Sequence, residues 1–256
     1  MISLVITAAG LGSRFHDVGY DQPKYLLPWV TNKEVLHEII NSLYYQGGID
    51  FILLVMNKRE LYFKEKIEQC IDEGINSKII FIGDTNGQSQ TTYIAASELV
   101  KLGLSNMPFL VHNSDTILKN RNIAILSNYP KDEPNLIGIV DTFQSNNSNY
   151  SYVLEKDGKL QSFLEKSVIS PKASSGLISF KSPLDFLEIY NKFNSNQFEN
   201  NQNSEAYLST LINKILCEEI YFKINHNDEN NKTIVLGTPE EYCRGYTLNA
   251  TGILGP

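Results

Sequence analysis

Short, continuous apolar runs alternate with segments of helical periodicity through the first half of the chain. A continuous apolar run is typical of a strand buried on both faces of a sheet, whereas apolar residues three and four positions apart indicate an amphipathic helix. The runs predict strands at residues 3–9, 51–56, 78–82, 109–112 and 135–141, and the periodic segments predict helices at 33–46, 60–73 and 91–102. This alternation favours a mainly parallel sheet covered by helices, with ligands bound at the carboxyl ends of its strands.

The pattern changes near residue 150. Two short apolar segments, 150–155 and 160–164, flank an Asp-Gly pair, which predicts a β-hairpin. A further strand is expected at 175–180, helices at 183–193 and 205–218, and a polar loop at 194–203. A helix start is expected at Thr238, because it is a good cap and is followed by a proline and, three residues on, by a glutamate. With no internal repeat, we expect a single α/β domain over residues 1–256.

Composition and charge exclude several classes of protein. The formal net charge of −7 argues against a nucleic-acid-binding surface, which is usually basic, so any polyanion site must be a local cluster of cations. No apolar segment approaches the ~20 residues of a membrane span, and the first apolar run is short and lacks a basic segment before it, so neither a membrane anchor nor a signal peptide is expected. Cys70, Cys217 and Cys243 lie far apart and in no metal-binding spacing, which favours reduced thiols and a cytoplasmic protein.

A glycine-rich turn follows the first predicted strand, and two cations lie close behind it. The two segments read Gly10-Leu11-Gly12-Ser13-Arg14 and Pro23-Lys24. Glycine lets backbone N–H groups approach an anion closely, and Arg14 offers a fixed fork of donors to phosphate oxygens. The proline before Lys24 stiffens the approach of a second cation. The alternative is a plain tight turn after a strand, since the turn matches neither the three-glycine dinucleotide motif nor a P-loop.

The two segments together resemble the signature of the sugar-phosphate nucleotidyltransferases, a family of nucleoside-triphosphate (NTP) transferases. The matching stretches are Ala8-Ala9-Gly10-Leu11-Gly12-Ser13-Arg14 and Pro23-Lys24-Tyr25-Leu26-Leu27-Pro28. The resemblance implies a Rossmann-like, GT-A-type fold with a mixed, mainly parallel sheet flanked by helices, and Mg²⁺ as cofactor. The β-helix that some relatives append has no counterpart here. The nucleotide-binding residues that the resemblance implies are Ala8, Ala9, Gly10, Leu11, Gly12, Ser13, Arg14, Lys24, Gly87, Gln88 and Ser114.

Asp115 is the candidate metal ligand. It follows the predicted strand at 109–112, and a carboxylate at the carboxyl end of a strand is placed to hold Mg²⁺ beside a phosphate. From spacing alone, Asp115 is more readily the cap of the next helix or turn. The resemblance favours the metal ligand, because the family's metal-binding aspartate stands at the end of this strand. We expect the neighbouring His112 and Asn113 to be structural.

Gly87 and Gln88 open the helix predicted at 91–102. The resemblance places the glycine close to the nucleotide and the glutamine at a base edge. The alternative is an ordinary loop in which Ser89 or Thr91 caps the helix.

Glu165 and Lys166 follow the predicted hairpin, and Gly176 lies on the next strand. A surface Glu-Lys pair is usually only solvated. The resemblance assigns Lys166 to the acceptor phosphate, Glu165 to an acceptor hydroxyl and Gly176 to the same acceptor site. It implies Arg14, Lys24 and Lys166 as the catalytic residues.

One departure from the family concerns its second metal ligand. Many relatives carry an aspartate two residues before a Gly-Thr-Pro-Glu segment, and Val235 stands at that place here. Either Asp115, phosphates and water hold the metal without it, or Asp228 or Glu229 substitutes. Mg²⁺ often keeps several waters as ligands, so one carboxylate does not disqualify the site.

The resemblance implies that an NTP and a phosphorylated small molecule give a nucleotide-linked product and pyrophosphate. A sugar 1-phosphate for capsule or lipopolysaccharide synthesis is the expected acceptor. Val235 leaves open a cytidylyltransferase acting on a non-sugar phosphate, such as a phosphocholine-like or phosphorylated amino-acid-derived acceptor. A GT-A glycosyltransferase would need an Asp-x-Asp motif, and residues 113–115 supply half of one. A catalytically silent, nucleotide-sensing relative is the last alternative. The base, the acceptor and the oligomeric state, a homo-oligomer included, stay open.

Overall fold

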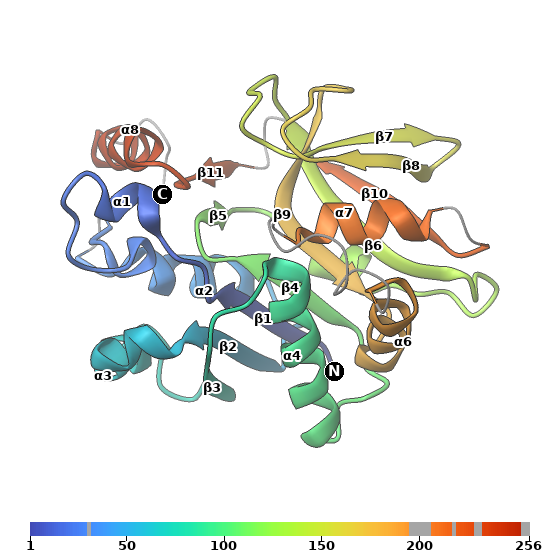
Figure 1. Ribbon diagram of the computed structural model, residues 1–256, viewed down its shortest axis with the longest axis horizontal. Coiled ribbons are helices and arrows are strands. Elements are labelled where there is room, and N and C mark those ends of the chain that lie inside the picture. The colour runs from blue at the N-terminus through green and yellow to red at the C-terminus, as the bar shows by residue number, and fades with distance from the viewer. Residues whose placement is uncertain (30–31, 195–205, 217–218, 228–231, 252–256) are drawn as a thin grey trace.

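The computed structural model describes residues 1–29, 32–194, 206–216, 219–227 and 232–251 (Figure 1). Its centre is a nine-stranded mixed sheet in the order β3-β2-β1-β4-β9-β6-β10-β8-β7. The strands of this sheet are β1 (Ser3–Ala8), β2 (Phe51–Asn57), β3 (Ser77–Ile82), β4 (Phe109–Asn113), β6 (Leu136–Gln144), β7 (Tyr152–Lys156), β8 (Lys159–Leu164), β9 (Lys172–Phe180) and β10 (Tyr221–Asn227). A second, small sheet pairs β5 (Thr116–Leu118) with β11 (Thr233–Val235).

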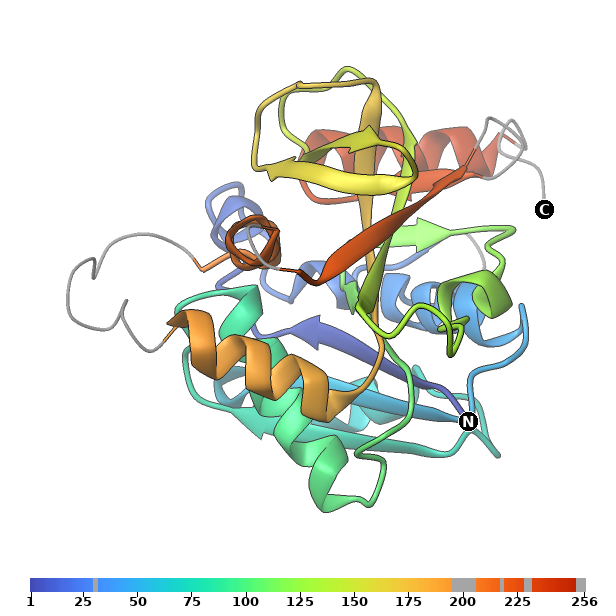
Figure 2. The same cartoon turned by 90° about the vertical axis from the view of Figure 1, so that its right-hand side faces the viewer.

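Helices cover both faces of the main sheet. They are α1 (Ser13–His16), α2 (Val35–Tyr44), α3 (Lys64–Glu68), α4 (Gln88–Lys101), α5 (Ile123–Leu126), α6 (Pro183–Asn194), α7 (Leu208–Ile215) and α8 (Pro239–Ala250). Two short 3₁₀ segments, η1 (Lys24–Leu26) and η2 (Lys58–Phe63), lie between them. In Figures 1 and 2, α4 and α6 lie side by side on one face of the sheet.

Strand β1 shows why a continuous apolar run becomes a central strand. It pairs in parallel with β2 on one side and β4 on the other, and all six of its residues are buried. Leu4 and Ile6 pack into a core shared with α2 and α3, whereas Val5 packs into a core shared with α4, α6 and α7. Apolar side chains therefore point to both faces at the centre of the strand, which removes the alternation seen in half-exposed strands.

The chain passes from the main sheet to the small sheet directly after β4. Asn113 ends β4 and Thr116 begins β5, so Ser114 and Asp115 form the connection between the two sheets. The next strand of the main sheet in space is β9, which runs antiparallel to both β4 and β6. The sheet is therefore mixed, as expected, with parallel pairing in β3-β2-β1-β4 and between β6 and β10.

Most of the predicted elements are confirmed, with ends that shift by a few residues. The hairpin of β7 and β8 turns at Asp157 and Gly158, whose φ angles of 54° and 75° are the positive values that a type I′ turn requires. The helix start at Thr238 is a complete capping box in which the side chains of Thr238 and Glu241 each accept a hydrogen bond from the other's backbone N–H.

The long helix predicted at 60–73 is wrong, because the chain forms η2 and then the short α3, which ends at Glu68. Asp72 holds the turn that follows. Its carboxylate accepts hydrogen bonds from Asn41 Nδ2 at 3.0 Å and from the Tyr45 hydroxyl at 2.9 Å. These partners on and next to α2 offer the segment an alternative to further helix. The sequence pattern also misses β5, β10 and β11, since β5 and β11 are three residues long and β10 is mostly polar.

A few predictions fall wholly or partly outside the described residues. Of the loop expected at 194–203, the structure describes residue 194 alone, as the end of α6. The helix expected at 205–218 is α7, and residues 205, 217 and 218 lie outside the described ranges, Cys217 among them. Cys70 is buried and Cys243 exposed, and both are free thiols. Among the helices that the structure describes, none has the length and apolar character needed to cross a bilayer.

Candidate active site

The carboxyl ends of β1 and β4 bring the two predicted halves of the site together. Thr7 pairs with Asn113 in the parallel register of these strands, so the glycine-rich turn after β1 and the 114–115 connection after β4 leave the sheet at the same edge. The Thr7 hydroxyl donates a hydrogen bond to the His112 carbonyl at 3.2 Å, which ties the two strand ends to each other. This edge is where ligands bind in open α/β sheets.

The glycine-rich turn is open on the side that a ligand would use. Ala8 and Ala9 are buried, but no atom lies within 4 Å of the point where a side chain on Gly10 would begin. Gly12 has a φ of 65° and caps α1, with its carbonyl accepting hydrogen bonds from Phe15 N at 3.1 Å and His16 N at 3.4 Å. The left-handed backbone at Gly12 is one that glycine adopts without strain.

The remaining turn residues are exposed. The Leu11 side chain is 63% exposed, and Ser13 and Arg14 begin the short helix α1 at the surface. Arg14 makes no hydrogen bond or ion pair with any residue within the described ranges, so its guanidinium is available to an anion.

Lys24 and Asp115 form an ion pair although they stand far apart in the sequence. Lys24 begins η1, directly after Pro23, and its Nζ lies 2.5 Å from Asp115 Oδ2. The two side chains are 24% and 19% exposed. Burial acts to raise the pKa of the Asp115 carboxyl, but the charge and hydrogen bond of Lys24 outweigh burial and hold that pKa below its ordinary value of 3.8. The structure thus joins a predicted phosphate ligand and the predicted metal ligand in one contact.

The small sheet places Val235 beside this pair. Val235 is the register partner of Thr116, and Leu236 N donates a hydrogen bond to the Asp115 carbonyl at 2.7 Å. Val235, which stands where many relatives carry the second aspartate, therefore lies close to Asp115 in space. Asp228 and Glu229, the two substitutes suggested by sequence, lie outside the described residues.

A buried charge pair holds the small sheet against the main one. Arg121 Nε lies 3.0 Å from Asp141 Oδ2 on β6, and both side chains are fully buried. Arg121 also donates a hydrogen bond to the Thr233 hydroxyl on β11. Asp141 further accepts hydrogen bonds from Ser175 at 2.6 Å, Asn225 at 2.8 Å and Asn227 at 2.5 Å. The position of β11, and with it the segment facing Asp115, depends on this network.

Gly87 and Gln88 lie at the start of α4, near the carboxyl end of β1. Gly87 is the N-cap with a φ of 141°, and a Cβ there would come within 2.6 Å of Ala206 N, so the chain itself requires this glycine. Gln88 Nε2 donates to the Thr7 hydroxyl at 3.2 Å, which places the glutamine next to the end of β1. The alternative cap by Ser89 or Thr91 is wrong, because their hydroxyls donate to the carbonyls of Ala206 and Gly87 instead.

Of the predicted acceptor residues, Glu165 and Lys166 directly follow β8, and Gly176 is part of β9. Glu165 Oε2 accepts hydrogen bonds from the hydroxyls of Ser151 at 2.5 Å and Ser209 at 3.0 Å, two partners that the sequence did not indicate. Lys166 is exposed and has a φ of 52°. Gly176 has a φ of 79°, and the Asn113 side chain fills the space that a Cβ there would take. The Asn113 side chain therefore packs against Gly176, and the structural role expected of Asn113 stays a prediction.

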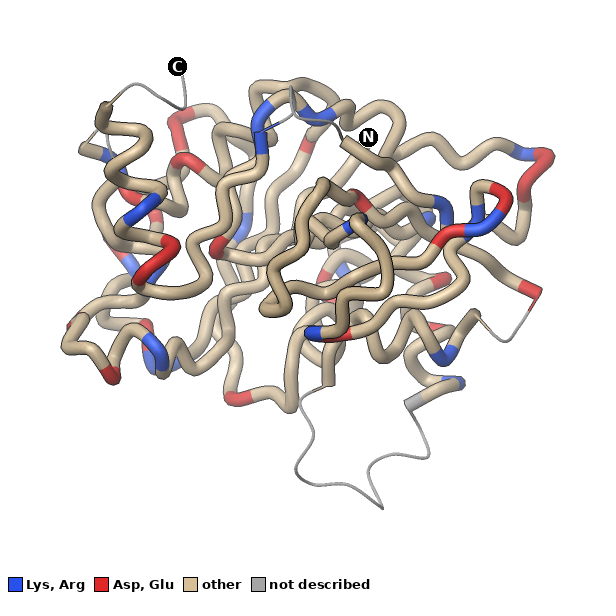
Figure 3. Tube along the Cα trace, turned by 90° about the horizontal axis from the view of Figure 1, so that it is seen from above, with Lys and Arg blue, Asp and Glu red and all other residues tan. Residues whose placement is uncertain are grey.

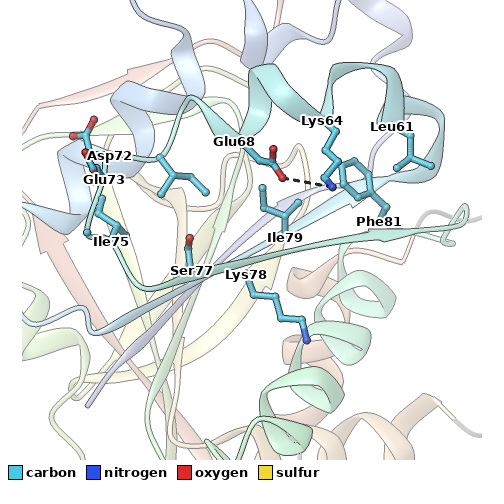
Figure 4. Close-up of a pocket in the computed structure, with 12 residues that line it drawn as sticks. Leu61, Lys64, Glu68, Asp72, Glu73, Ile75, Ser77, Lys78, Ile79 and Phe81 are labelled. Atoms are coloured by element: carbon cyan, nitrogen blue, oxygen red, sulfur yellow. Dashed lines mark ion pairs between the residues drawn. The ribbon is translucent and has the colours of Figure 1, made fainter.

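Charges of both signs are spread along the rest of the described chain (Figure 3). Figure 3 shows lysine and arginine interspersed with aspartate and glutamate along the chain trace. A hollow of about 550 Å³ lies between α3 and the edge strand β3 (Figure 4). The exposed pair of Lys64 and Glu68, 3.7 Å apart, lies beside it, and no predicted site residue lines it.

The groups present fit a divalent cation supported by few protein ligands. Asp115 offers a hard carboxylate, and within the described ranges no three His, Cys, Asp or Glu side chains converge as metal ligands would. A Cβ at residue 237 would lie 3.3 Å from Asp115 Oδ2, so Gly237 keeps the space beside this carboxylate clear. Such a site suits Mg²⁺, which fills the rest of its shell with water and phosphate oxygens.

Comparison with known proteins identifies the family. A family model described as nucleotidyl transferase matches residues 3–224. A UTP–glucose-1-phosphate uridylyltransferase of Staphylococcus haemolyticus (strain JCSC1435) is 25% identical over 186 residues, which cover 63% of this chain and 64% of that relative.

Solved structures share the fold. A nucleoside-diphosphate-sugar pyrophosphorylase from Vibrio cholerae RC9 matches with a TM-score of 0.77 and 25% identity, over 96% of this chain and 100% of that one. An inositol-1-phosphate CTP transferase from T. maritima matches with a TM-score of 0.73 and 14% identity, over 98% and 96% of the two chains. These likenesses confirm the Rossmann-like, GT-A-type fold. Because the family match spans most of the chain, this protein belongs to the nucleotidyl transferase family and is an enzyme of that type.

Proposed function

We propose that this enzyme joins an NTP to a sugar 1-phosphate and releases pyrophosphate. The observation that carries the proposal is the Lys24–Asp115 pair beside the open turn at Gly10. One cation, one carboxylate and a row of backbone N–H groups stand where a triphosphate bound at the carboxyl end of β1 would lie. The names of the Staphylococcus and Vibrio relatives support a sugar phosphate as the acceptor.

The reaction needs positioning and charge neutralisation more than proton transfer. An oxygen of the acceptor phosphate forms a bond to the α-phosphorus of the NTP. The bond from that phosphorus to the oxygen bridging the β-phosphate breaks, and the electron pair leaves with pyrophosphate. The attacking phosphate is already anionic, so no general base is required.

Each predicted residue has a role in this step. Lys24 contacts the α-phosphate, and Arg14 with the backbone of residues 10–13 holds the leaving pyrophosphate. Asp115 would hold Mg²⁺, whose charge, when bound, stabilises the phosphate oxygens. Lys166 contacts the acceptor phosphate and Glu165 an acceptor hydroxyl, with the two serines that hydrogen-bond to Glu165 fixing its orientation.

The nucleotide site lies between the turn and α4. Gln88, held next to Thr7, is placed to contact a base edge, with Gly87, Ala8 and Ala9 beside it and Ser114 at the end of β4. Because Val235 replaces the aspartate that many relatives use as a second metal ligand, a second candidate function stays open: a cytidylyltransferase that acts on a non-sugar phosphate. A role in capsule or lipopolysaccharide synthesis would follow from the sugar nucleotide formed.

The test is a pyrophosphate-release assay with Mg²⁺, in which ATP, CTP, GTP, UTP and dTTP are each paired with a panel of sugar 1-phosphates and phosphocholine. We expect one NTP to react with a sugar 1-phosphate, and Asp115→Asn to abolish turnover. Lys33→Ala, which removes an exposed lysine outside the site, is the control. Reaction of CTP with a non-sugar phosphate alone would establish the second candidate. Absence of acceptor-dependent pyrophosphate release would overturn both.

A further inference from the structure

The carboxylates of Asp115 and Glu241 both lie close to Gly237. The point where a side chain on residue 237 would begin lies 3.3 Å from Asp115 Oδ2 and 3.4 Å from Glu241 Oε2. Glu241 is in the first turn of α8, and the sequence marks it as a partner of the helix cap. The fold therefore brings a second acidic oxygen to the space beside the predicted metal ligand.

Glu241 carries a charge that its local partners do not neutralise. The residue is 8% exposed, and its carboxylate accepts one hydrogen bond from the Tyr150 hydroxyl at 2.9 Å and one from Thr238 N at 3.0 Å. Both donors are neutral, and no lysine or arginine within the described ranges pairs with Glu241. Buried carboxylates are usually paired with a cation or bound to a metal.

The capping box does not require this charge. Glutamine serves in the same place as well as glutamate, because the box uses a side-chain oxygen as an acceptor. The Tyr150 hydroxyl is likewise a neutral donor whose own proton is retained, since burial and the Glu241 carboxylate raise the pKa of Tyr150. The ionised carboxylate has lone pairs left over beyond these two hydrogen bonds. A cation in the adjoining space would account for a glutamate there.

We propose that Glu241 is the second carboxylate of the metal site, replacing the aspartate that Val235 has displaced. This inference rests on the proposed function. The Val235 side chain has no atom that binds a cation, whereas Glu241 Oε2 lies 3.4 Å from the Cβ position at residue 237, in the space beside Asp115. The hydrogen bond from Thr238 N holds Oε2 in the cap, so Glu241 would act through a water on the metal and orient that water, as carboxylates outside the direct ligand set commonly do.

The test measures Mn²⁺ affinity of the full-length protein by electron paramagnetic resonance of free Mn²⁺, without nucleotide. Glu241→Gln keeps both hydrogen bonds of the cap and removes the charge, and we expect it to weaken Mn²⁺ binding about 10–100-fold. Glu240→Gln is the matched control, since it removes the same charge one residue away at an exposed position and should leave the affinity unchanged. Equal thermal midpoints of the two variants would confirm that the cap is intact.

A second variant tests the replacement itself. Val235→Asp in the Glu241→Gln background should restore the lost affinity, because it returns a carboxylate to the place that relatives use. If Asp115→Asn abolishes Mn²⁺ binding while Glu241→Gln leaves it unchanged, the role of Glu241 is overturned and the proposed function stands. If wild-type protein does not bind Mn²⁺, or Asp115→Asn has no effect on that binding, this inference is overturned, and the pyrophosphate-release assay decides the proposed function separately.

Discussion

Replacing Arg121 by methionine would leave Asp141 as a buried charge without a cation. Both side chains are fully buried and 3.0 Å apart, so neither is screened by water. Removing one partner of a buried ion pair typically costs about 3–5 kcal/mol of folding free energy, because the remaining charge keeps its desolvation cost. Ser175, Asn225 and Asn227 still donate to Asp141 in the variant, which favours the lower part of that range.

Urea unfolding followed by circular dichroism measures this loss. Arg59→Met is the matched control, because Arg59 and Asp84 form an equally close pair at 2.7 Å whose side chains are 54% and 70% exposed. Exposed pairs contribute about 0–1 kcal/mol. The double variant Arg121→Met with Asp141→Asn removes both charges and should recover part of the loss. A loss below about 1 kcal/mol for Arg121→Met, or no recovery in the double variant, would refute the reasoning.

Three further predictions concern the active site and its support. Lys24→Ala should lower turnover on the order of 10²–10³-fold, like the loss of one preorganised donor, and an unchanged rate in the pyrophosphate assay would remove Lys24 from the mechanism. Because the pKa of Asp115 is lowered in the folded protein, its carboxylate contributes stability above pH 3.8 that is lost as the pH falls through the lowered value. Replacing Lys24 removes the largest influence that lowers the pKa of Asp115, so that pKa should rise. The thermal-midpoint difference between wild type and Lys24→Met should then shrink on acidification from neutral pH, and a constant difference would contradict the ion pair. Gly87→Ala should destabilise the protein, because a Cβ would lie 2.6 Å from Ala206 N at a φ of 141°, and an unchanged thermal midpoint would count against that packing.

Local sequence predicts well the part of the candidate site that follows β1. The strand at the start of the chain, its glycine turn and the lysine after Pro23 are close in sequence and their chemistry is specific. The contact between Lys24 and Asp115 follows once β1 and β4 are neighbours in a parallel sheet, which the alternation of strands and helices indicates. Propensity and motif agree here with the tertiary structure.

The parts that sequence reasoning misses depend on contacts between distant segments. The helix predicted at 60–73 fails because Asp72 binds side chains on and beside α2, and no local pattern reports that. Strands β5 and β11 have three residues each, too few for a periodic signal, and they pair across more than a hundred residues of chain. Glu241 fits its capping motif so well that the motif conceals its burial beside Asp115.

The contact between Lys24 and Asp115 has a thermodynamic consequence for how the enzyme binds its metal ion and its nucleotide. In the free protein each group is the other's counterion, so neither Lys24 nor Asp115 is left as an unpaired charge. If a metal ion binds Asp115 in the absence of nucleotide, Lys24 loses its partner. If a triphosphate binds Lys24 in the absence of metal, the Asp115 carboxylate faces an anion. Arrival of both satisfies all four groups at once. Metal and nucleotide should therefore tighten each other's binding by the same factor, as linkage requires, and the resting ion pair sets how large that factor is.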